Sequence, residues 1–254
     1  MNAIISVNKL AIQIGSRFLM KDVSFDIKEG DAILLSGENG NGKTTLLKAI
    51  MQIDRAGKHF TGNIFFRNYG DLLTLGDEEL QKLKTHIAYV SQKDDYSRMG
   101  TVLVKDLFSE SSESASGRSL TSGEINDLID KWIPRKSDNR RVFDAKSKPA
   151  KFSGGEQRLL TVFSALVTRP HAELLIIDEP LNNLDFENAK LISNLINRVV
   201  RENPKMGLIM ISHCRIFPFI TREIRLSDMS IQELANHYVC HSCFGTPNSD
   251  GYYT

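Results

Sequence analysis

Residues 37–44 read GENGNGKT, and this stretch decides the fold of the chain. The run AILLS (32–36) before it is almost entirely apolar, which indicates a strand buried on both faces of a sheet. The segment TTLLKAIM (44–51) after it has apolar residues at helical spacing. The spacing G-x-x-x-x-G-K-T between a strand and a helix predicts a loop whose backbone N–H groups surround phosphate.

Each residue type in this loop suits phosphate chemistry. Glycine lets the backbone approach a ligand closely, lysine supplies a positive charge to the β- and γ-phosphates, and the threonine hydroxyl can bind Mg²⁺. An ordinary glycine-rich turn is the alternative, but every fixed position matches in the right context. The predicted ATP contacts in the loop are Gly37, Glu38, Asn39, Gly40, Asn41, Gly42, Lys43, Thr44 and Thr45, and Thr44 is also a predicted Mg²⁺ ligand.

Composition limits the classes of protein to consider. The chain has 254 residues, 41% of them hydrophobic and 25% charged, with a formal net charge of +1. These values do not suggest disorder, and no basic excess indicates nucleic acid. No apolar run approaches the roughly 18 residues of a membrane span, and the first ten residues lack the pattern of a signal peptide. We therefore expect a cytoplasmic location.

A second phosphate signal is LLIIDEP (174–180), a predicted central strand ending in two acids. Asp178 at the carboxyl end of such a strand can hold Mg²⁺, and Glu179 lies where a base for the attacking water is required. The alternative is a buried strand followed by a surface acidic pair. The phosphate loop upstream makes that alternative improbable.

Strands alternate with helices along the rest of the chain. The predicted fold is α/β, a P-loop NTPase core with a mainly parallel sheet, an N-terminal antiparallel β subdomain and an inserted helical subdomain at about 93–151. One domain is expected over 1–229, followed by a C-terminal helix and tail over 230–254. The expected strands are 3–8, 10–14, 23–27, 63–67, 86–91, 173–178 and 207–212; helices are expected near 76–84 and 124–133, a mobile serine-rich loop at 109–119, and helix caps at Thr121 and Ser230.

The motif SGGEQ (153–157) identifies a family. Together with the phosphate loop, Gln92, the DEP run, NNLD (182–185) and His213, it resembles the ATP-binding cassette (ABC) ATPases in order and spacing from about residue 4 to about 226. The resemblance implies a head-to-tail dimer around two ATP molecules. The second ABC subunit of this dimer is expected to be an identical chain. Each loop would then face the SGGEQ motif of the other subunit.

The resemblance also implies roles for single residues. It assigns Gln92 to Mg²⁺ and to sensing the γ-phosphate, and His213 to a hydrogen bond with the γ-phosphate. Simpler readings are a solvated loop residue for Gln92 and a polar strand end for His213. Catalysis is thus predicted at Glu179, His213, Gln92 and Lys43; further ATP contacts at Ser153, Gly154, Gly155, Glu156 and Asp185; Mg²⁺ binding at Thr44, Gln92 and Asp178.

Departures from the family pattern concern the base and the helix after SGGEQ. Relatives often carry an aromatic residue near position 14 that stacks on adenine, and here that position is Ile14. Phe18 is the nearest aromatic residue, and we expect it in the core. Ile14 is therefore the predicted base contact. The other departures are Phe152 for Leu, Glu156 for Gln, Ser164 for Arg and Cys214 for Asp.

The end of the chain contains a possible metal site. His237, Cys240, His241 and Cys243 lie close together in the sequence and include a Cys-x-x-Cys pair. A short docking helix with reduced thiols is the alternative, and we favour it because such a closely spaced ligand set is strained.

One cassette without a long coiled coil suggests the nucleotide-binding subunit of an ABC transporter. A separate membrane subunit would then hold the chain at the cytoplasmic face of the membrane, docking near Tyr96, Met99, Val102 and Leu103. The rival interpretation is a soluble ABC ATPase of an assembly, defence or nucleic-acid complex. The basic run PRKSDNRR (134–141) is read as a solvated face, and no direct nucleic-acid contact is expected. The sequence does not define the transported substrate or the direction of transport.

Overall fold

The three apolar runs of the sequence form the central strands of a six-stranded sheet. They are β3 (Ala32–Ser36), β6 (Leu174–Asp178) and β7 (Gly207–Ile211). Their side chains alternate between two cores, so that Ile33 and Leu35 of β3 contact one core and Ala32 and Leu34 the other. A strand buried on both faces has no polar side, which explains the continuous apolar runs. The computed structural model describes residues 3–92, 96, 99–135, 138–169 and 171–234.

The strand order of this sheet is β5-β6-β7-β3-β8-β9. The additional strands are β5 (Ile87–Val90), β8 (Arg222–Ser227) and β9 (Ser230–Leu234). All neighbours pair in parallel except β8 and β9, which form an antiparallel hairpin. The carboxyl ends of the parallel strands therefore meet at one edge, where ligands bind in open α/β sheets.

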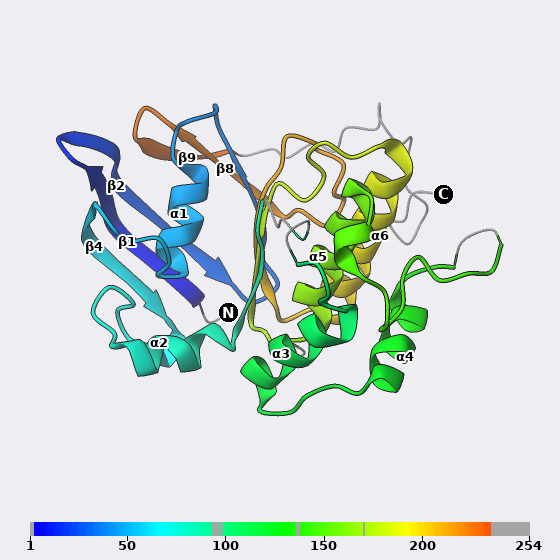
Figure 1. The fold of residues 1–254 in the computed structure, drawn as a ribbon. Helices are drawn as coiled ribbons and strands as arrows, with labels where there is room; N and C mark the ends of the chain where they lie inside the picture. Colours follow the sequence, from blue (N-terminus) through cyan, green and yellow to red (C-terminus); the bar gives the residue numbers. More distant parts are fainter. Residues whose placement is uncertain (1–2, 93–95, 97–98, 136–137, 170, 235–254) are drawn as a thin grey trace.

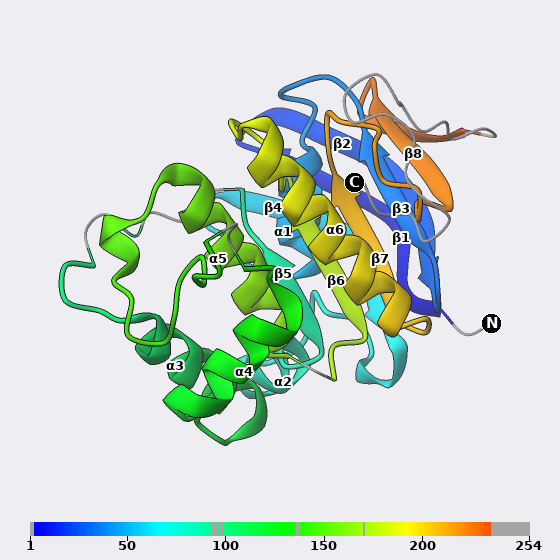
Figure 2. The same cartoon turned by 90° about the vertical axis from the view of Figure 1, so that its right-hand side faces the viewer.

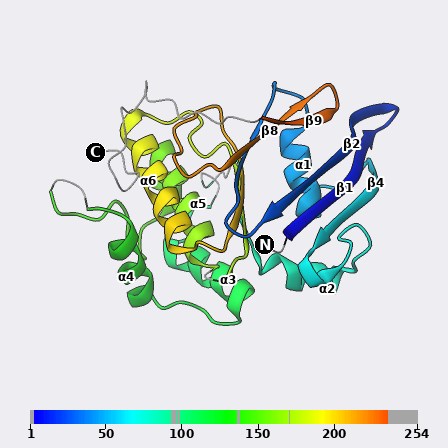
Figure 3. The same cartoon turned by 180° about the vertical axis from the view of Figure 1, so that it is seen from behind.

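A second, antiparallel sheet covers one face of the first. Its order is β2-β1-β4, from β1 (Ala3–Ile14), β2 (Arg17–Lys28) and β4 (Lys58–Phe66). It shares a core with α1 (Lys43–Ile50), α2 (Asp77–Lys84) and the main sheet. Figure 1 shows this sheet and α1 on one side of the molecule, and Figure 3 shows the same arrangement from behind.

Helices cover the opposite face of the main sheet (Figure 2). The helices there are α3 (Val104–Ser116), α4 (Ser122–Trp132), α5 (Gly154–Val167) and α6 (Phe186–Glu202); short 3₁₀ turns occur at Arg67–Tyr69 and Pro149–Lys151. Within the described ranges, no helix combines the length and apolar character that crossing a bilayer requires. The predicted α/β fold, with its antiparallel β sheet and its helices between β5 and β6, is confirmed.

The N-terminal segment forms two long strands where three were predicted. The expected strands 3–8 and 10–14 are one continuous strand, β1, with a bulge at Asn8–Lys9. Lys9 has φ of +47°, and its backbone N–H donates to the Ser24 hydroxyl at 2.8 Å. The polar pair that interrupts the sequence pattern is therefore a bulge inside a strand and not a turn between strands.

The serine-rich segment at 109–119 was predicted to be a mobile loop, and this prediction is wrong for most of its length. Helix α3 continues to Ser116. The Ser112 hydroxyl donates to the Ser109 carbonyl, and the Ser116 hydroxyl donates to the Ser112 carbonyl. These local bonds satisfy the hydroxyl groups on the helix itself, while Phe108 packs into the core. In contrast, the helix cap at Thr121 is confirmed, because its hydroxyl accepts the N–H of Glu124.

The helix predicted to begin at Ser230 is also wrong. Residues 230–234 form β9, which pairs with β8 and so belongs to the main sheet. The turn residues Asp228 and Met229 both have positive φ, as expected of a tight two-residue hairpin turn. Pairing with β8 satisfies the backbone of Ser230 in place of a helix cap. The predicted division of the chain into 1–229, a nested 93–151 and a tail stays a prediction.

Candidate functional site

The predicted phosphate loop joins the carboxyl end of β3 to the start of α1. Gly37, Gly40 and Gly42 have φ of +134°, +86° and +91°. A Cβ on Gly37 would lie 2.3 Å from the carbonyl oxygen of Leu226, and a Cβ on Gly42 would lie 2.7 Å from Cγ of Leu19. The course of the loop therefore requires glycine at positions 37 and 42. Thr44 and Thr45 occupy the first turn of α1, and Asn39 lies in the exposed part of the loop.

Lys43 is held inside this loop. Its Nζ donates to the carbonyl oxygens of Gly37 and Glu38 at 2.8 and 2.9 Å. Burial lowers the pKa of Lys43, and the carboxylates of Glu179 and Asp178 act in the opposite direction. The ammonium group is thus close to the two acids that the sequence associates with Mg²⁺ and water.

Asp178 ends β6 and is fully buried. Burial raises its pKa; the Thr44 hydroxyl and the charge of Arg158 act to lower it, and the Glu179 charge raises it further. The Thr44 hydroxyl lies close enough to affect the pKa, but among the described residues no hydrogen bond of ordinary geometry reaches either carboxylate oxygen. A buried carboxylate in this state is costly, and its oxygens are available to a ligand.

Two other predicted catalytic side chains, those of Gln92 and His213, contact the Glu179 carboxylate. Its Oε2 accepts hydrogen bonds from Nε2 of Gln92 at 3.3 Å and from Nδ2 of Asn182 at 3.0 Å. Its Oε1 lies 3.1 Å from Nε2 of His213. Gln92, Glu179 and His213 each follow one of three adjacent parallel strands, which explains why they converge. Sequence reasoning missed Asn182, although its place three residues after Glu179 was a usable signal.

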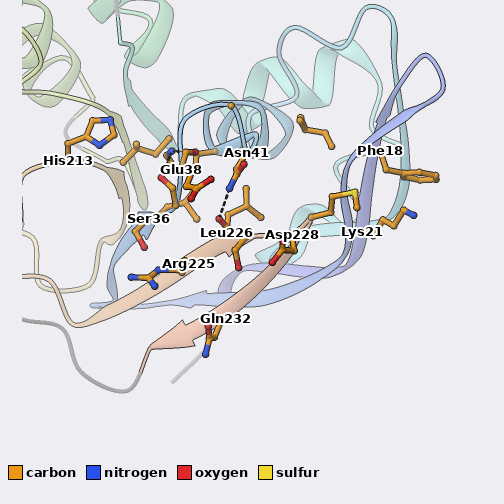
Figure 4. A pocket seen from close by; sticks show the side chains of 18 of the residues that line it. Phe18, Lys21, Ser36, Glu38, Asn41, His213, Arg225, Leu226, Asp228 and Gln232 are labelled. Carbon is orange, nitrogen blue, oxygen red and sulfur yellow. Dashed lines mark hydrogen bonds between the residues drawn. The ribbon is translucent and has the colours of Figure 1, made fainter.

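The loop and His213 open onto a cavity of about 1020 Å³. Predicted site residues that line it are Gly37, Glu38, Gly40, Asn41, Lys43 and His213. Figure 4 shows His213 at one end of the cavity and Phe18 at the other, with Glu38 and Asn41 between them. The β8–β9 hairpin forms part of the wall through Leu226, Asp228 and Gln232. An elongated ligand with phosphates at the loop would therefore extend toward Phe18.

The prediction that Phe18 lies in the core is wrong. Its side chain is 36% exposed and lines the cavity, because residues 17–21 of β2 run past the phosphate loop at the rim of the sheet. The Lys21 ammonium lies 4.4 Å from the Phe18 ring centroid. Ile14, the predicted base contact, is 46% exposed and is not among the residues that form the cavity wall.

The SGGEQ motif begins helix α5, away from this cavity. The Ser153 hydroxyl accepts the N–H of Glu156, and the Glu156 carboxylate accepts the N–H of Ser153, so the two residues form a capping box. A Cβ on Gly155 would lie 2.3 Å from Nδ2 of Asn188, whose side chain donates to Asp185 at 2.7 Å. The motif and Asp185 are therefore joined within one chain. The residues Ser153, Gly154, Gly155, Glu156 and Asp185 do not line the cavity formed by the described residues.

The structure accounts for three of the departures from the family pattern. The Phe152 ring stacks on Phe143 with centroids 5.5 Å apart, so the larger side chain is accommodated by an aromatic neighbour. Glu156 completes the capping box described above. Cys214 makes its backbone contacts with the Ser212 hydroxyl, and these do not depend on its side chain. Nothing in the structure explains Ser164.

The predicted docking residues lie at different depths. Tyr96 is buried, with its hydroxyl 3.2 Å from the Thr161 hydroxyl, so it belongs to the core and not to a surface groove. Met99 is 37% exposed, and Val102 and Leu103 are half-buried. The surface available to a partner is therefore smaller than predicted.

Two other predictions concern the basic run and the segment rich in cysteine and histidine. In the basic run at 134–141, Arg135 and Arg141 both pair with Asp130, and Arg140 pairs with Asp138. These pairs agree with a solvated face. His237, Cys240, His241 and Cys243 lie outside the described residues, and no cluster of potential metal ligands occurs within the described part of the chain.

Comparisons with known proteins agree with this fold. The model of the family described as ABC transporter matches residues 20–182, more than half of the chain. The lipoprotein-releasing system ATP-binding protein LolD of Bdellovibrio bacteriovorus is 28% identical over 206 residues, which cover 79% of this chain and 84% of that protein. A solved ATP-binding subunit of an ABC transporter superposes with a TM-score of 0.70 at 20% identity, covering 91% of this chain and 90% of the other. A dimeric bacterial ABC transporter cassette gives 0.67 at 23% identity, covering 91% and 99%.

Proposed function

The chain belongs to the ABC transporter family as an ATP-binding and ATP-hydrolysing subunit, and we propose that Lys43, Gln92, Glu179 and His213 carry its chemistry. The observation behind this proposal is the convergence of Gln92, Asn182 and His213 on the Glu179 carboxylate beside the phosphate loop. A carboxylate held by three side chains from separate segments is preorganised to orient a water molecule.

Binding of ATP follows from the loop and its lysine. The backbone N–H groups of residues 39–45 and the start of α1 favour negative charge, and Lys43 adds a cation to the β- and γ-phosphates. The Lys43 ammonium, now bonded to two loop carbonyls, would exchange these contacts for phosphate oxygens. The base would lie toward Phe18, whose ring is the aromatic surface in the cavity wall.

The residues also fit Mg²⁺. Asp178 offers a buried carboxylate without a hydrogen-bond partner among the described residues, and the Thr44 hydroxyl and Gln92 amide are oxygen ligands of the kind Mg²⁺ prefers. When bound, the ion would neutralise charge on the β- and γ-phosphates. The Asp178 carboxylate would then gain a charged partner that compensates for its burial.

Hydrolysis follows from the group around Glu179. Its carboxylate can accept a proton from water, and Gln92 and Asn182 fix the orientation of that carboxylate. His213 Nε2, 3.1 Å from the same carboxylate, is placed to donate toward the γ-phosphate. Gln92, Glu179 and His213 follow the carboxyl ends of β5, β6 and β7, so the rigid strands of the sheet support the segments that carry these side chains.

A dimer explains why Ser153 and Gly155 lie away from the cavity. Ser153 is the N-cap residue of α5, and a helix start offers N–H groups and a positive dipole end to an anion. In a head-to-tail dimer of two copies, Ser153 of one copy would contact the γ-phosphate held by Lys43 of the other. ATP then closes the dimer and hydrolysis opens it.

The closing and opening of the dimer can drive transport only if the movement is passed to another protein. This partner would be a separate membrane subunit that contacts the exposed Met99 and its half-buried neighbours Val102 and Leu103. This subunit would hold the chain at the cytoplasmic face of a membrane. Within the rival interpretation, a soluble ABC ATPase of an assembly, defence or nucleic-acid complex, contact with nucleic acid has less support because the arginines of the basic run are paired with Asp130 and Asp138.

The test uses Glu179→Gln, which keeps the shape of the side chain but removes the base. With Mg²⁺-ATP this variant should elute as a stable dimer in size-exclusion chromatography, while the wild type elutes mainly as a monomer. Adding Ser153→Arg should abolish the dimer, and adding Lys43→Ala should abolish ATP binding itself. A Glu179→Gln protein that binds ATP but stays monomeric contradicts the sandwich.

A further inference from the structure

Arg158 is a buried arginine in the second turn of α5, and its side chain is 9% exposed. Its Nε donates to the carbonyl oxygen of Pro180 at 3.0 Å, and its Nη2 donates to those of Asp178 and Glu179 at 3.1 and 2.9 Å. Its Nη1 donates to the carbonyl oxygen of Ser91. One guanidinium thus binds three successive carbonyls on one segment and a fourth on another.

The three successive carbonyls belong to a strained turn. Glu179 has φ of +47°, a region that residues other than glycine rarely adopt. Such a conformation persists only where several contacts hold it. The Glu179 N–H donates to Ile211 at 2.9 Å, and the Arg158 guanidinium holds the carbonyls on both sides of that residue. The direction of the Glu179 carboxylate therefore depends on Arg158.

The fourth carbonyl precedes Gln92. Ser91 follows β5, so its bond to Arg158 fixes the backbone from which the Gln92 side chain extends. A second contact lies three residues further along α5, where the Thr161 hydroxyl is 3.2 Å from the Tyr96 hydroxyl. Residues 158 and 161 share one face of the helix. Helix α5 is therefore attached to the segments on both sides of Gln92 as well as to Glu179.

We propose that Arg158 is a positioning residue that links the two ATP sites of the dimer. The inference rests on the proposed function. Ser153, the N-cap residue of α5, would contact ATP held by the other subunit, and Arg158 lies five residues, about 7.5 Å, further along the helix at 1.5 Å per residue. A shift of α5 caused by that ATP would move the carbonyls around Glu179 and Gln92 in the subunit's own site. Occupation of one site would thereby promote hydrolysis in the other.

The experiment compares the wild type with Arg158→Ala, Arg158→Lys and Arg198→Ala. Arg198 is a matched control, since its guanidinium is also hydrogen-bonded, to the Glu202 carboxylate and the Lys131 carbonyl, but these contacts join α6 to α4 and do not reach the segments around Glu179 and Gln92. Hydrolysis is measured against ATP concentration to give kcat, the half-saturating concentration and the Hill coefficient. ATP affinity is measured separately by calorimetric titration, and folding by thermal unfolding.

Arg158→Ala should lower kcat by about a hundredfold, the scale expected of a misplaced catalytic group, and bring the Hill coefficient to one. Its ATP affinity should change little. Millimolar guanidinium should restore part of the turnover in Arg158→Ala but not affect Arg198→Ala. Arg158→Lys keeps the charge but cannot reach all four carbonyls, so its turnover and Hill coefficient should lie between those of the wild type and Arg158→Ala.

Several outcomes would overturn the inference. One is a folded Arg158→Ala with the turnover and Hill coefficient of the wild type. Another is a loss of turnover that only follows a loss of stability, with no effect of guanidinium. A wild type that hydrolyses ATP without cooperativity also overturns it while leaving the proposed function intact. If Arg158→Ala does not fold, an Arg158→Lys variant with the Hill coefficient of the wild type would also overturn the inference. A wild type that binds no ATP contradicts the proposed function itself.

Discussion

Replacing Asp178 by Asn should stabilise the ligand-free protein although it damages the proposed Mg²⁺ site. The carboxylate is fully buried, and neither oxygen has a hydrogen-bond partner among the described residues. Burial raises its pKa, which means that the charged form is disfavoured in the folded state. The neutral amide has nearly the same shape and removes the buried negative charge.

The magnitude follows from two opposing contributions. A buried group left without a partner costs about 1–3 kcal/mol, and more when it is charged. The Thr44 hydroxyl and the charges of Arg158 and Lys48 offset part of this cost. We therefore expect a net stabilisation of about 1–2 kcal/mol, which raises the midpoint of thermal unfolding by about 2–4 °C per kcal/mol in a chain of this size.

The pH dependence has a definite sign. Because the folded pKa of Asp178 is raised above the unfolded value, the folded protein binds a proton more tightly than the unfolded chain. The cost is fully present above the folded pKa and disappears below the unfolded pKa. The difference in midpoint between Asp178→Asn and the wild type should therefore be largest at neutral pH and shrink as the pH falls through the folded pKa.

Differential scanning calorimetry without nucleotide or Mg²⁺ measures this difference at several pH values. Asp130→Asn is the matched control, since hydrogen bonds and charges from Arg141 and Arg135 lower the pKa of Asp130 and its replacement should lower the midpoint at neutral pH. Mg²⁺-ATP should then raise the midpoint of the wild type more than that of Asp178→Asn. A lower midpoint for ligand-free Asp178→Asn at neutral pH, or a difference that does not change with pH, would refute the reasoning.

Three further predictions test other parts of the chain. Phe18→Ala should weaken ATP binding by about 1 kcal/mol, the lower end for aromatic stacking because the ring is partly exposed. Ile14→Ala should weaken binding less. If calorimetric titration gives the reverse order, the adenine base contacts Ile14 and not Phe18. Gly37→Ala should lose more ATP affinity than Gly40→Ala, since only the former places a Cβ against a backbone oxygen; equal losses would show that strain in φ alone matters. Met99→Glu should release the chain from native membranes in a sedimentation assay while ATP turnover is unchanged, and unchanged sedimentation would contradict docking at this residue.

The parts of the fold that the sequence predicted are those fixed by continuous local patterns. Apolar runs at 32–36, 174–178 and 207–211 specify strands buried on both faces, and glycine spacing specifies the loop between β3 and α1. The convergence of Gln92, Glu179 and His213 was also predictable, because parallel strands end at a common edge. These features require no knowledge of distant partners.

The errors arise where a distant partner decides the local structure. The segment at 230–234 has the cap pattern of a helix, but β8 offers an unpaired edge that makes it a strand. Serines at 109–116 have poor helix propensity, yet packing of Phe108 and local hydroxyl bonds keep them helical. Phe18 looked like a core residue because its position at the rim of the cavity depends on how β2 passes the loop.

Site residues were missed for a similar reason. Asn182 and Arg158 act through contacts that only the folded chain defines, and Arg158 lies 20 residues from Asp178 and 67 from Ser91 along the sequence. No spacing rule connects residues across such intervals. A buried arginine beside carbonyl groups becomes visible only when α5 is packed on the sheet.

The strand order also determines when the chain can first bind ATP during its synthesis. The sheet β2-β1-β4 uses only residues up to Phe66 and can form early. In contrast, β3 pairs with β7 through Ala32 and Leu208 and with β8 through Ile33 and Arg222, so its partners are translated 176 and 189 residues later. At about 5–20 residues per second, the strand that carries the phosphate loop waits roughly ten to forty seconds for its neighbours. Until then both edges of β3 lack their hydrogen-bonding partners, and the face that carries Ala32 and Leu34 lacks the helices that cover it, so a ribosome-bound chain needs protection from aggregation for that interval.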